Sequence, residues 1–315
     1  MNNKNSSNKK IPFAFIIAMV VFGTIAIFVK NINISSGEKA LYRAILALIV
    51  ISGYLIVSKS KIDLKSIKKE LILLLISGAA MGFNWILLFE SYNYTTIAVS
   101  TLCYYMAPII VTVFCALVFK EKLSKKEIIC FTLATLGVVL VVGTIGLSGK
   151  GTDLTGILFG LGAAVLYATV ILINKYIKKV EGIHRTFFQF ISAIIVLMPY
   201  VLITDGINIG KLDNIGWINL LVLGVVHTGI AYCLYFSSMR KMKGQEVAVL
   251  SYIDPFIALI ISISIETTTI YQIIGAVMII GFSIINEIEL SKINIFKHKN
   301  YEFNPPKWKS INKKV

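Results

Sequence analysis

The sequence predicts an all-α membrane protein of ten transmembrane helices, built as two inverted five-helix repeats with both termini in the cytoplasm. Composition, the spacing of apolar stretches and the distribution of basic residues predict this fold. Of the 315 residues, 57% are hydrophobic and 15% are charged, whereas soluble proteins average about 45–50% apolar and about 25% charged residues. The mean hydropathy of +0.80 agrees. These values exclude a soluble two-domain protein.

Ten apolar stretches reach the length of a spanning helix, which needs about 20 residues. They lie at about 12–30, 38–57, 70–90, 95–119, 125–146, 154–174, 186–204, 214–237, 246–265 and 269–288. The first stretch follows three lysines, as in a signal peptide. However, it is too long for the apolar part of a signal peptide and lacks a small-residue cleavage site, so we expect it to stay as a span.

The 31 lysines and arginines alternate with the connections. They gather in both tails and in the even-numbered connections, whereas the odd-numbered ones hold only Lys30, Lys39, Lys150 and Lys211. Cytoplasmic loops carry an excess of basic residues, so this alternation predicts ten spans with both termini inside. The net charge of +15 is spread between apolar runs rather than on one face, and we therefore expect no nucleic-acid partner.

The two halves of the chain match at one constant offset. The offset pairs Gly82 with Gly229, Phe89 with Phe236, Ser91 with Ser238, Tyr105 with Tyr252 and Pro108 with Pro255. Because a repeat of five spans is odd, the second repeat must run inverted, which is an architecture of alternating-access transporters. We predict an N-terminal tail at 1–11, repeats at 12–146 and 154–288, an outer linker at 147–153 and a basic cytoplasmic tail at 289–315.

Several short motifs follow one another in order along the two halves. They are Arg43, Gly82-Phe83-Asn84-Trp85, Cys103-Tyr104-Tyr105-Met106-Ala107-Pro108, Pro108-x12-Glu121 with Lys122-Leu123-Ser124, Ser251-Tyr252-Ile253-Asp254-Pro255 and Ile274-Gly275-Ala276. Over about residues 12–288 the chain resembles EamA-type members of the drug/metabolite transporter superfamily. The resemblance implies a ten-helix exporter or importer of small metabolites, amino acids among them. The halves also differ, because Pro255 to Glu266 is shorter than Pro108 to Glu121, and Gln189 stands near where the first repeat has Arg43.

Ionisable residues inside a bilayer are costly and are functional candidates. Asp254 lies midway along the ninth span, directly before Pro255. That proline removes a backbone donor, which leaves carbonyl groups that can line a cavity. Asp254 is suited to bind a proton, a cation or a substrate amine; the alternative is a structural aspartate bonded to nearby hydroxyls. Pro108 is expected to interrupt the fourth span in the same way.

Three further polar residues lie within spans. Arg43 and Glu90 are at similar depths near the outer ends of the second and third spans, which suggests a pair that acts as an outer gate or as a structural tie. His227, midway along the eighth span, could titrate near neutral pH. A neutral histidine bonded within the bundle is the alternative reading.

An apolar cavity with a few placed polar groups suits a small organic solute. The candidates at intermediate depth are Asn84, Trp85, Tyr104, Tyr105, Tyr167, Tyr232 and Tyr252. Each could instead be an ordinary packing residue. The small-residue pairs Gly78-x3-Gly82 and Gly156-x3-Gly160 predict close helix contacts.

The chain carries no H-E-x-x-H, G-x-S-x-G or Walker A motif and no metal-ligand cluster, so we expect no enzymatic activity, no cofactor and no metal. Without an ATP site, transport has to use a gradient. The expected partners are a small-molecule substrate, the lipid bilayer and a coupling ion such as the proton.

We predict a secondary transporter in a bacterial cytoplasmic membrane that exports an amino acid or related solute. It would work by alternating access about a cavity lined by spans 1, 3, 4, 6, 8 and 9. One alternative is a flippase for a lipid-linked substrate, which needs a cation-lined cavity open to lipid. The other is a membrane-embedded enzyme or sensor, which needs clustered catalytic groups.

Overall fold

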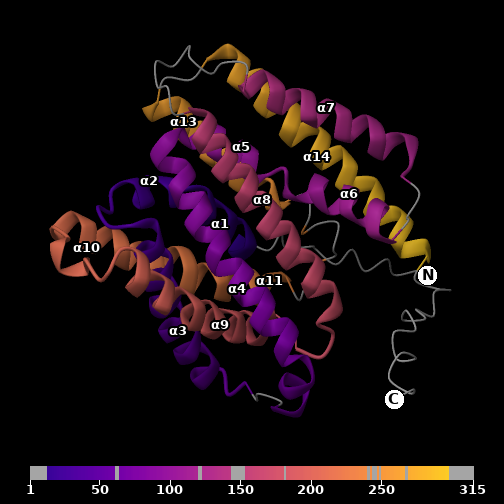
Figure 1. The fold of residues 1–315 in the computed structure, drawn as a ribbon. Coiled ribbons are helices and arrows are strands. Elements are labelled where there is room, and N and C mark those ends of the chain that lie inside the picture. The colour runs from indigo at the N-terminus through magenta and orange to yellow at the C-terminus, as the bar shows by residue number, and fades with distance from the viewer. Residues whose placement is uncertain are drawn as a thin grey trace, which may run out of the picture.

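The structure, a computed structural model, describes residues 13–60, 64–119, 123–142, 153–180, 182–239, 250–266 and 269–297, with positions 242 and 247. These segments are helical and contain no strand (Figure 1). The elements are α1 Phe13–Gly23, α2 Ile25–Lys30, α3 Ser36–Val57, α4 Leu64–Tyr94, α5 Ile97–Tyr104, α6 Ala107–Phe119, α7 Lys125–Val142, α8 Asp153–Tyr176, α9 Gly182–Thr204, the 3-10 turn η1 Ile209–Lys211, α10 Asn214–Leu221, the π-helix η2 Val222–Ile230, α11 Ala231–Met239, α13 Ile253–Ile265 and α14 Ile270–Lys297.

Seven helical segments are long and apolar enough to cross a membrane. Large apolar side chains also point outward, with exposed fractions of 76% for Ile56, 82% for Val57 and 83% for Ile203. Soluble proteins rarely expose large contiguous apolar patches, whereas lipid is a suitable surrounding for such side chains. The chain is an all-helical, multi-pass membrane protein.

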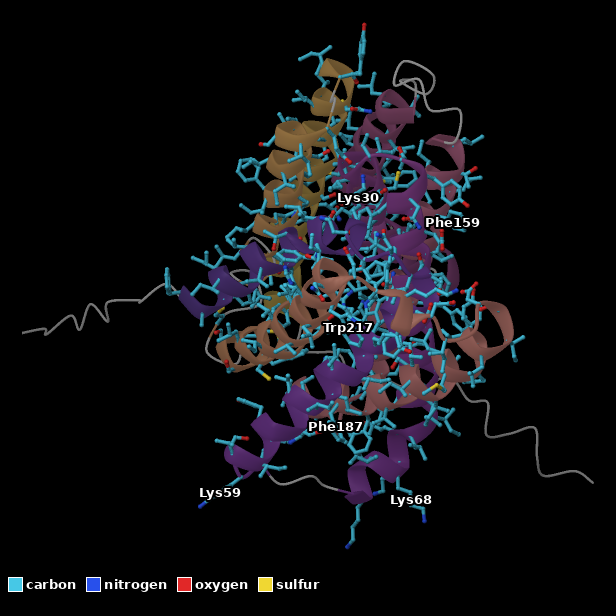
Figure 2. All side chains as sticks on the ribbon, turned by 90° about the vertical axis from the view of Figure 1, so that its left-hand side faces the viewer. Lys30, Lys59, Lys68, Phe159, Phe187 and Trp217 are labelled. Atoms are coloured by element: carbon cyan, nitrogen blue, oxygen red, sulfur yellow. The ribbon has the colours of Figure 1, made fainter. Side chains whose placement is uncertain are left out.

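The predicted number of ten spans goes further than these seven segments. The helices at the fifth, ninth and tenth predicted spans (α7, α13 and α14) are not among the seven, so ten spans and the side on which the termini lie remain predictions. Lys59 and Lys68, from one connection, both extend from the lower end of the bundle in Figure 2. Both ends of that connection therefore lie at the same end of the bundle.

Three of the predicted spans are interrupted. Thr24 separates α1 from α2, Tyr105 and Met106 separate α5 from α6, and a turn at Tyr252 precedes α13. The last two breaks lie just before Pro108 and Pro255, where the sequence predicted irregular helix, because each proline lacks the N–H that would close the preceding turn.

The proline breaks have the same backbone conformation in both halves. The φ and ψ angles are −74° and 4° at Tyr105 and −75° and −3° at Tyr252. These two residues are paired by the sequence offset, so local geometry agrees with the internal repeat.

The two halves also pack on each other reciprocally. Helix α4 of the first half lies along α8 and α9, the first two long helices of the second half. In the same way, η2 and α11 of the second half lie along α3 and α1. Each half thus inserts its third predicted span between the first two of the other, as an inverted repeat requires.

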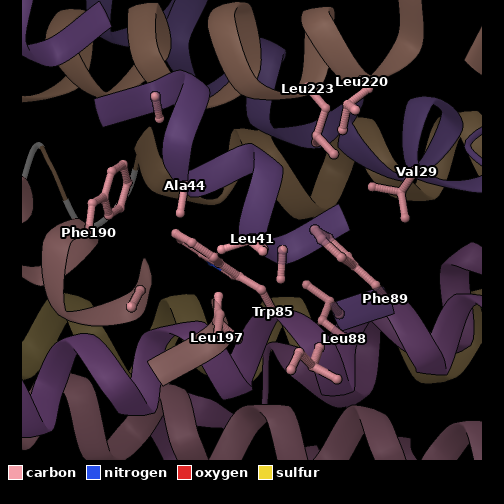
Figure 3. Packing of buried hydrophobic residues seen from close by; sticks show 14 of the residues in the cluster. Val29, Leu41, Ala44, Trp85, Leu88, Phe89, Phe190, Leu197, Leu220 and Leu223 are labelled. Carbon is pink, nitrogen blue, oxygen red and sulfur yellow. The ribbon is translucent and has the colours of Figure 1, made fainter. Parts of the chain in front are cut away.

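The main apolar core fills the space between α3, α4, α9 and η2 (Figure 3). Trp85 lies at its centre, with Leu41, Leu88 and Leu197 around it. Trp85 is 4% exposed and Leu197 is fully buried. This core fixes one wall of the region in which the functional candidates lie.

Glycines allow the closest helix contacts. A Cβ atom on Gly78 would lie 2.4 Å from the Gln189 carbonyl oxygen of α9, and one on Gly156 would lie 2.6 Å from the Thr95 side chain. Real Cβ atoms do not approach so closely, so only glycine fits. In the other half, a Cβ atom on Gly224 of η2 would lie 2.5 Å from the Leu46 side chain of α3. The predicted small-residue contacts are therefore present, and they hold the reciprocal packing together.

We expect Gly78→Ala to destabilise the protein, because the added methyl group meets backbone atoms of α9 that cannot rotate away. Overpacking of this kind costs about 1–3 kcal/mol. The thermal unfolding midpoint in detergent should fall by several degrees. Gly53→Ala is the matched control, since a Cβ atom there has nothing within 4 Å; equal midpoints for the two variants would contradict the close α4–α9 contact.

Candidate functional site

A cavity of about 520 Å³ lies between the two halves. Its wall includes Phe22, Ala26, Arg43, Trp85, Tyr104, Tyr105, Tyr167, Gln189, Tyr232, Asp254 and Ala258. The lining comes from all six spans predicted to contribute, and also from the second and seventh through Arg43 and Gln189. A volume in this range is typical of small-molecule sites.

Asp254 provides the acidic group of the cavity. It is the second residue of α13, immediately after the turn at Tyr252, and Pro255 beside it is buried. The Tyr105 hydroxyl lies close to the Asp254 carboxylate. Helix α1 comes close behind, because a Cβ atom on Gly23 would lie 2.6 Å from the Asp254 carbonyl oxygen. The carboxylate is therefore held at a helix break and faces the cavity.

Arg43 provides a buried basic group and is 4% exposed. Its Nε donates a hydrogen bond of 2.7 Å to the Thr228 hydroxyl, and Thr228 donates at 2.8 Å to the Leu223 carbonyl inside the π-helix. The guanidinium carbon lies 4.5 Å from the centre of the Trp85 ring. A cation over an aromatic face is stabilised by the ring quadrupole. The arginine is thus supported on two sides while it lines the cavity.

Aromatic rings form a substantial part of the remaining wall. Tyr104 and Tyr167 are stacked with ring centres 5.1 Å apart and planes at 20°. Tyr232 makes edge contacts with Phe22 at 5.3 Å and Phe190 at 5.6 Å. The predicted candidates Trp85, Tyr104, Tyr105, Tyr167 and Tyr232 all line the cavity. Its surface therefore combines apolar ring faces with hydroxyl groups.

The cavity extends to one end of the bundle. Lys175, Arg185, Met239 and Ser251 line that end, where Lys175 is exposed and Arg185 is partly exposed. From the sequence, both basic residues were interpreted only as signals of topology. Lys175 lies at the C-terminal end of α8 and Arg185 in the N-terminal part of α9, on either side of one connection. This position was the only sequence signal that they could lie at a mouth of the cavity.

Two predicted binding residues belong to helix packing. Asn84 is 2% exposed, and its amide donates a hydrogen bond of 2.6 Å to the Ala163 carbonyl of α8. His227, also 2% exposed, has Nε2 2.8 Å from the Thr24 hydroxyl and Nδ1 3.2 Å from the Val222 carbonyl. Neither side chain lines the cavity, because each points toward a neighbouring helix.

The remaining candidates lie around the cavity. Tyr252 is buried at the helix break rather than on the cavity wall, and Pro108 and Pro255 set the breaks. The predicted Arg43–Glu90 pair is not formed: Arg43 bonds to Thr228, and Glu90 accepts a 3.3 Å hydrogen bond from Asn93. Arg43 and Glu90 lie at a similar depth on different helices, but their side chains bond to different partners. Glu121, the motif residue of the first repeat, lies outside the described residues.

Comparisons with known proteins agree on one family. The EamA-like transporter family matches residues 9–143 and 154–286, once in each half. An uncharacterized transporter of Bacillus subtilis, YxxF, is 28% identical over 271 residues, which are 84% of this chain and 85% of the relative. A probable amino-acid metabolite efflux pump of Salmonella typhimurium is 27% identical over 182 residues, 54% of this chain and 60% of that protein.

The fold itself is also known from crystallography. A protein of known crystal structure superposes with a TM-score of 0.59, covering 88% of this chain and 96% of its own, at 16% identity. The two family matches cover most of the chain, and they coincide with the two halves that pack reciprocally around the cavity. The chain belongs to the EamA-like transporter family.

Proposed function

We propose that the protein is a secondary active transporter that exports an amino acid or a related small solute across a bacterial cytoplasmic membrane by alternating access. It would cross the membrane ten times, as two inverted repeats with both termini inside. The observation that carries the proposal is a cavity between the repeats whose wall holds the Asp254 carboxylate and the buried Arg43 guanidinium together with aromatic rings, and whose mouth carries Lys175 and Arg185.

The charges of the cavity suit a zwitterion. Asp254 would attract the ammonium group of an amino acid, and Arg43 would bind its carboxylate through a planar, charge-assisted hydrogen-bond arrangement. Tyr104, Tyr167 and Tyr232 would contact the side chain of the solute. Both charged groups are largely removed from bulk water, which strengthens their interactions with a ligand.

Export rather than import rests on two arguments. The Salmonella relative is named a probable amino-acid metabolite efflux pump. In addition, the open mouth with Lys175 and Arg185 lies at the end that the basic connections predict to be cytoplasmic, so the cavity would load from inside. The two cations at the mouth would attract the carboxylate end of a solute.

The energy for transport would come from a gradient rather than from ATP. We propose that Asp254 couples the movement of protons along that gradient to the movement of the solute. A carboxyl group that alternates between protonated and charged forms can exchange a proton for the ammonium group of the solute. The Tyr105 hydroxyl, which contacts that carboxylate, would hold it in position in either form.

We expect Asp254→Asn to reduce proton-driven amino-acid transport in proteoliposomes by at least about tenfold, equivalent to about 1.4 kcal/mol. Asparagine keeps the size of the side chain but cannot carry the charge. Asp205→Asn, at an exposed position, is the control and should transport normally. Unchanged flux of the Asp254 variant at all pH values would remove this residue from the mechanism.

Arg43→Gln should abolish recognition of the solute carboxylate. A ligand that binds only the folded protein raises its apparent stability, so binding can be followed by thermal unfolding with a panel of amino acids and their methyl esters. The wild-type protein should prefer the free acid, and the variant should bind acid and ester equally. A preference that survives in Arg43→Gln would argue against this assignment.

Cysteine labelling tests the topology without any substrate. In a background without native cysteines, single cysteines at the exposed positions Lys59 and Ser124 should react with an impermeant thiol reagent only from inside. A cysteine at Lys211, also exposed, should react only from outside. Labelling of all three from one side would refute the proposed ten-span arrangement.

A further inference from the structure

We propose that α2, α5 and α13 form the outer gate of the cavity and that Glu266 holds this gate closed. The inference rests on the proposed transport function, and it assigns a role to Glu266 and Lys30, which do not line the cavity. It is carried by the contacts of one carboxylate with three helices and by the breaks at which those helices begin or end.

Glu266 directly follows α13, and its side chain is 14% exposed. One carboxylate oxygen forms an ion pair with Lys30, the last residue of α2. The other accepts a hydrogen bond of 2.7 Å from the Ile97 backbone N–H, at the first residue of α5. A single side chain therefore joins the ends of three helices from predicted spans 1, 4 and 9.

Ser262 strengthens the same junction. Its hydroxyl donates a 2.6 Å hydrogen bond to the second Glu266 oxygen and accepts a 3.1 Å hydrogen bond from the Ala98 N–H. Ser262 is fully buried, so water does not compete for these bonds. Helices α13 and α5 lie beside each other here (Figure 1).

The junction lies directly beyond the cavity. Along α13, Asp254 and Ala258 line the cavity, and Ser262 and Glu266 follow at one-turn intervals. Along α5, Tyr104 and Thr101 line it, and Ile97 is one further turn away. Along α2, Ile25 and Ala26 line it before Lys30. All three helices thus leave the cavity in one direction and meet at Glu266.

The opposite end of each of these helices lies at a break. Helix α2 starts after Thr24, α5 ends before Tyr105, and α13 starts after Tyr252. Discontinuous helices whose half-helices end beside the binding site are a feature of many transporters. The three segments can therefore tilt at their breaks without unwinding the helices on the other side.

This geometry also couples the gate to the cavity. Asp254 is the second residue of α13, and Tyr105, whose hydroxyl lies close to the Asp254 carboxylate, follows the last residue of α5. A proton or solute bound at Asp254 would act on two of the three hinges. In the described conformation the gate is closed at the Glu266 end and the cavity reaches the surface at Lys175.

The test measures access to the cavity from outside. Ala258→Cys, in a background without native cysteines, places a thiol on the cavity wall one turn below Ser262. In right-side-out vesicles an impermeant maleimide should react slowly with this thiol. Adding Glu266→Gln should raise the rate at least tenfold, because the ion pair is lost and the bond to Ile97 weakened. Lys30→Gln should raise it less, since the bonds to Ile97 and Ser262 remain.

Asp205→Asn is the matched control, because it removes an exposed acidic group at the same predicted face, and it should leave the rate unchanged. Thermal unfolding identifies variants that fail to fold. Equal labelling rates in folded wild-type, Lys30→Gln and Glu266→Gln proteins would overturn the proposal.

A second variant tests the closed gate directly. Cysteines at Ala98 and Ser262 allow this test by oxidative cross-linking, because the Ala98 N–H donates a 3.1 Å hydrogen bond to the Ser262 hydroxyl and the two residues therefore lie close together. Oxidation should stop outside labelling of a cavity thiol in the Glu266→Gln background, and reduction should restore it; continued labelling after cross-linking would contradict the gate. Since labelling needs no solute, a wrong substrate would leave this test intact, and a failed gate would leave solute binding intact.

Discussion

The need to satisfy backbone polar groups inside a bilayer determines where this protein can bind a solute. Irregular backbone is tolerated at membrane depth only where it faces protein or a water-filled space. The breaks at Thr24, Tyr105 and Tyr252 all adjoin one cavity, and residues beside each break line it. Pro108 and Pro255 cause two of the breaks, because a proline has no backbone N–H to donate to the preceding turn. The cavity, its acidic group and the hinges proposed for gating all follow from these interruptions.

The two halves share a frame but have divided the chemistry between them. The first half carries Arg43, while the second has Gln189 near the equivalent position. Gln189 bonds to Ser77 at 2.7 Å and to Asn174 at 2.8 Å, so its amide serves helix packing as well as the cavity wall. The acidic group comes only from the second half, since Ala107 stands at the offset from Asp254. Because the two repeats contribute opposite charges, the two sides of the cavity differ. This suits a solute that carries a different charged group at each end.

Sequence patterns predicted an all-helical membrane protein and several residues of the cavity wall, because these features leave signals that do not depend on side-chain orientation. Helices appear as apolar runs, and Asp254 and Arg43 are conspicuous as charges within them. Depth along a helix does not reveal which way a side chain points, so it did not indicate that Asn84 and His227 bond to neighbouring helices and do not line the cavity. No proline lies near the break at Thr24, so no sequence signal indicated it. The Arg43–Glu90 pair was predicted from equal depth alone, and the contact with Thr228 depends on the π-helix, which no pattern indicated.

A gate in a transporter has to be strong enough to close and weak enough to open. Conformations that exchange during transport differ by only a few kcal/mol, so a fully buried ion pair, whose disruption costs about 3–5 kcal/mol, would hold one state too firmly. Lys30 and Glu266 retain 28% and 14% side-chain exposure, and a pair of this kind is partly solvated. The buried hydrogen bonds of Ser262 orient the Glu266 carboxylate without adding another charged group. Water that enters when α2, α5 and α13 separate can replace each lost contact of Glu266, which keeps the open state within reach of the free energy supplied by binding at Asp254.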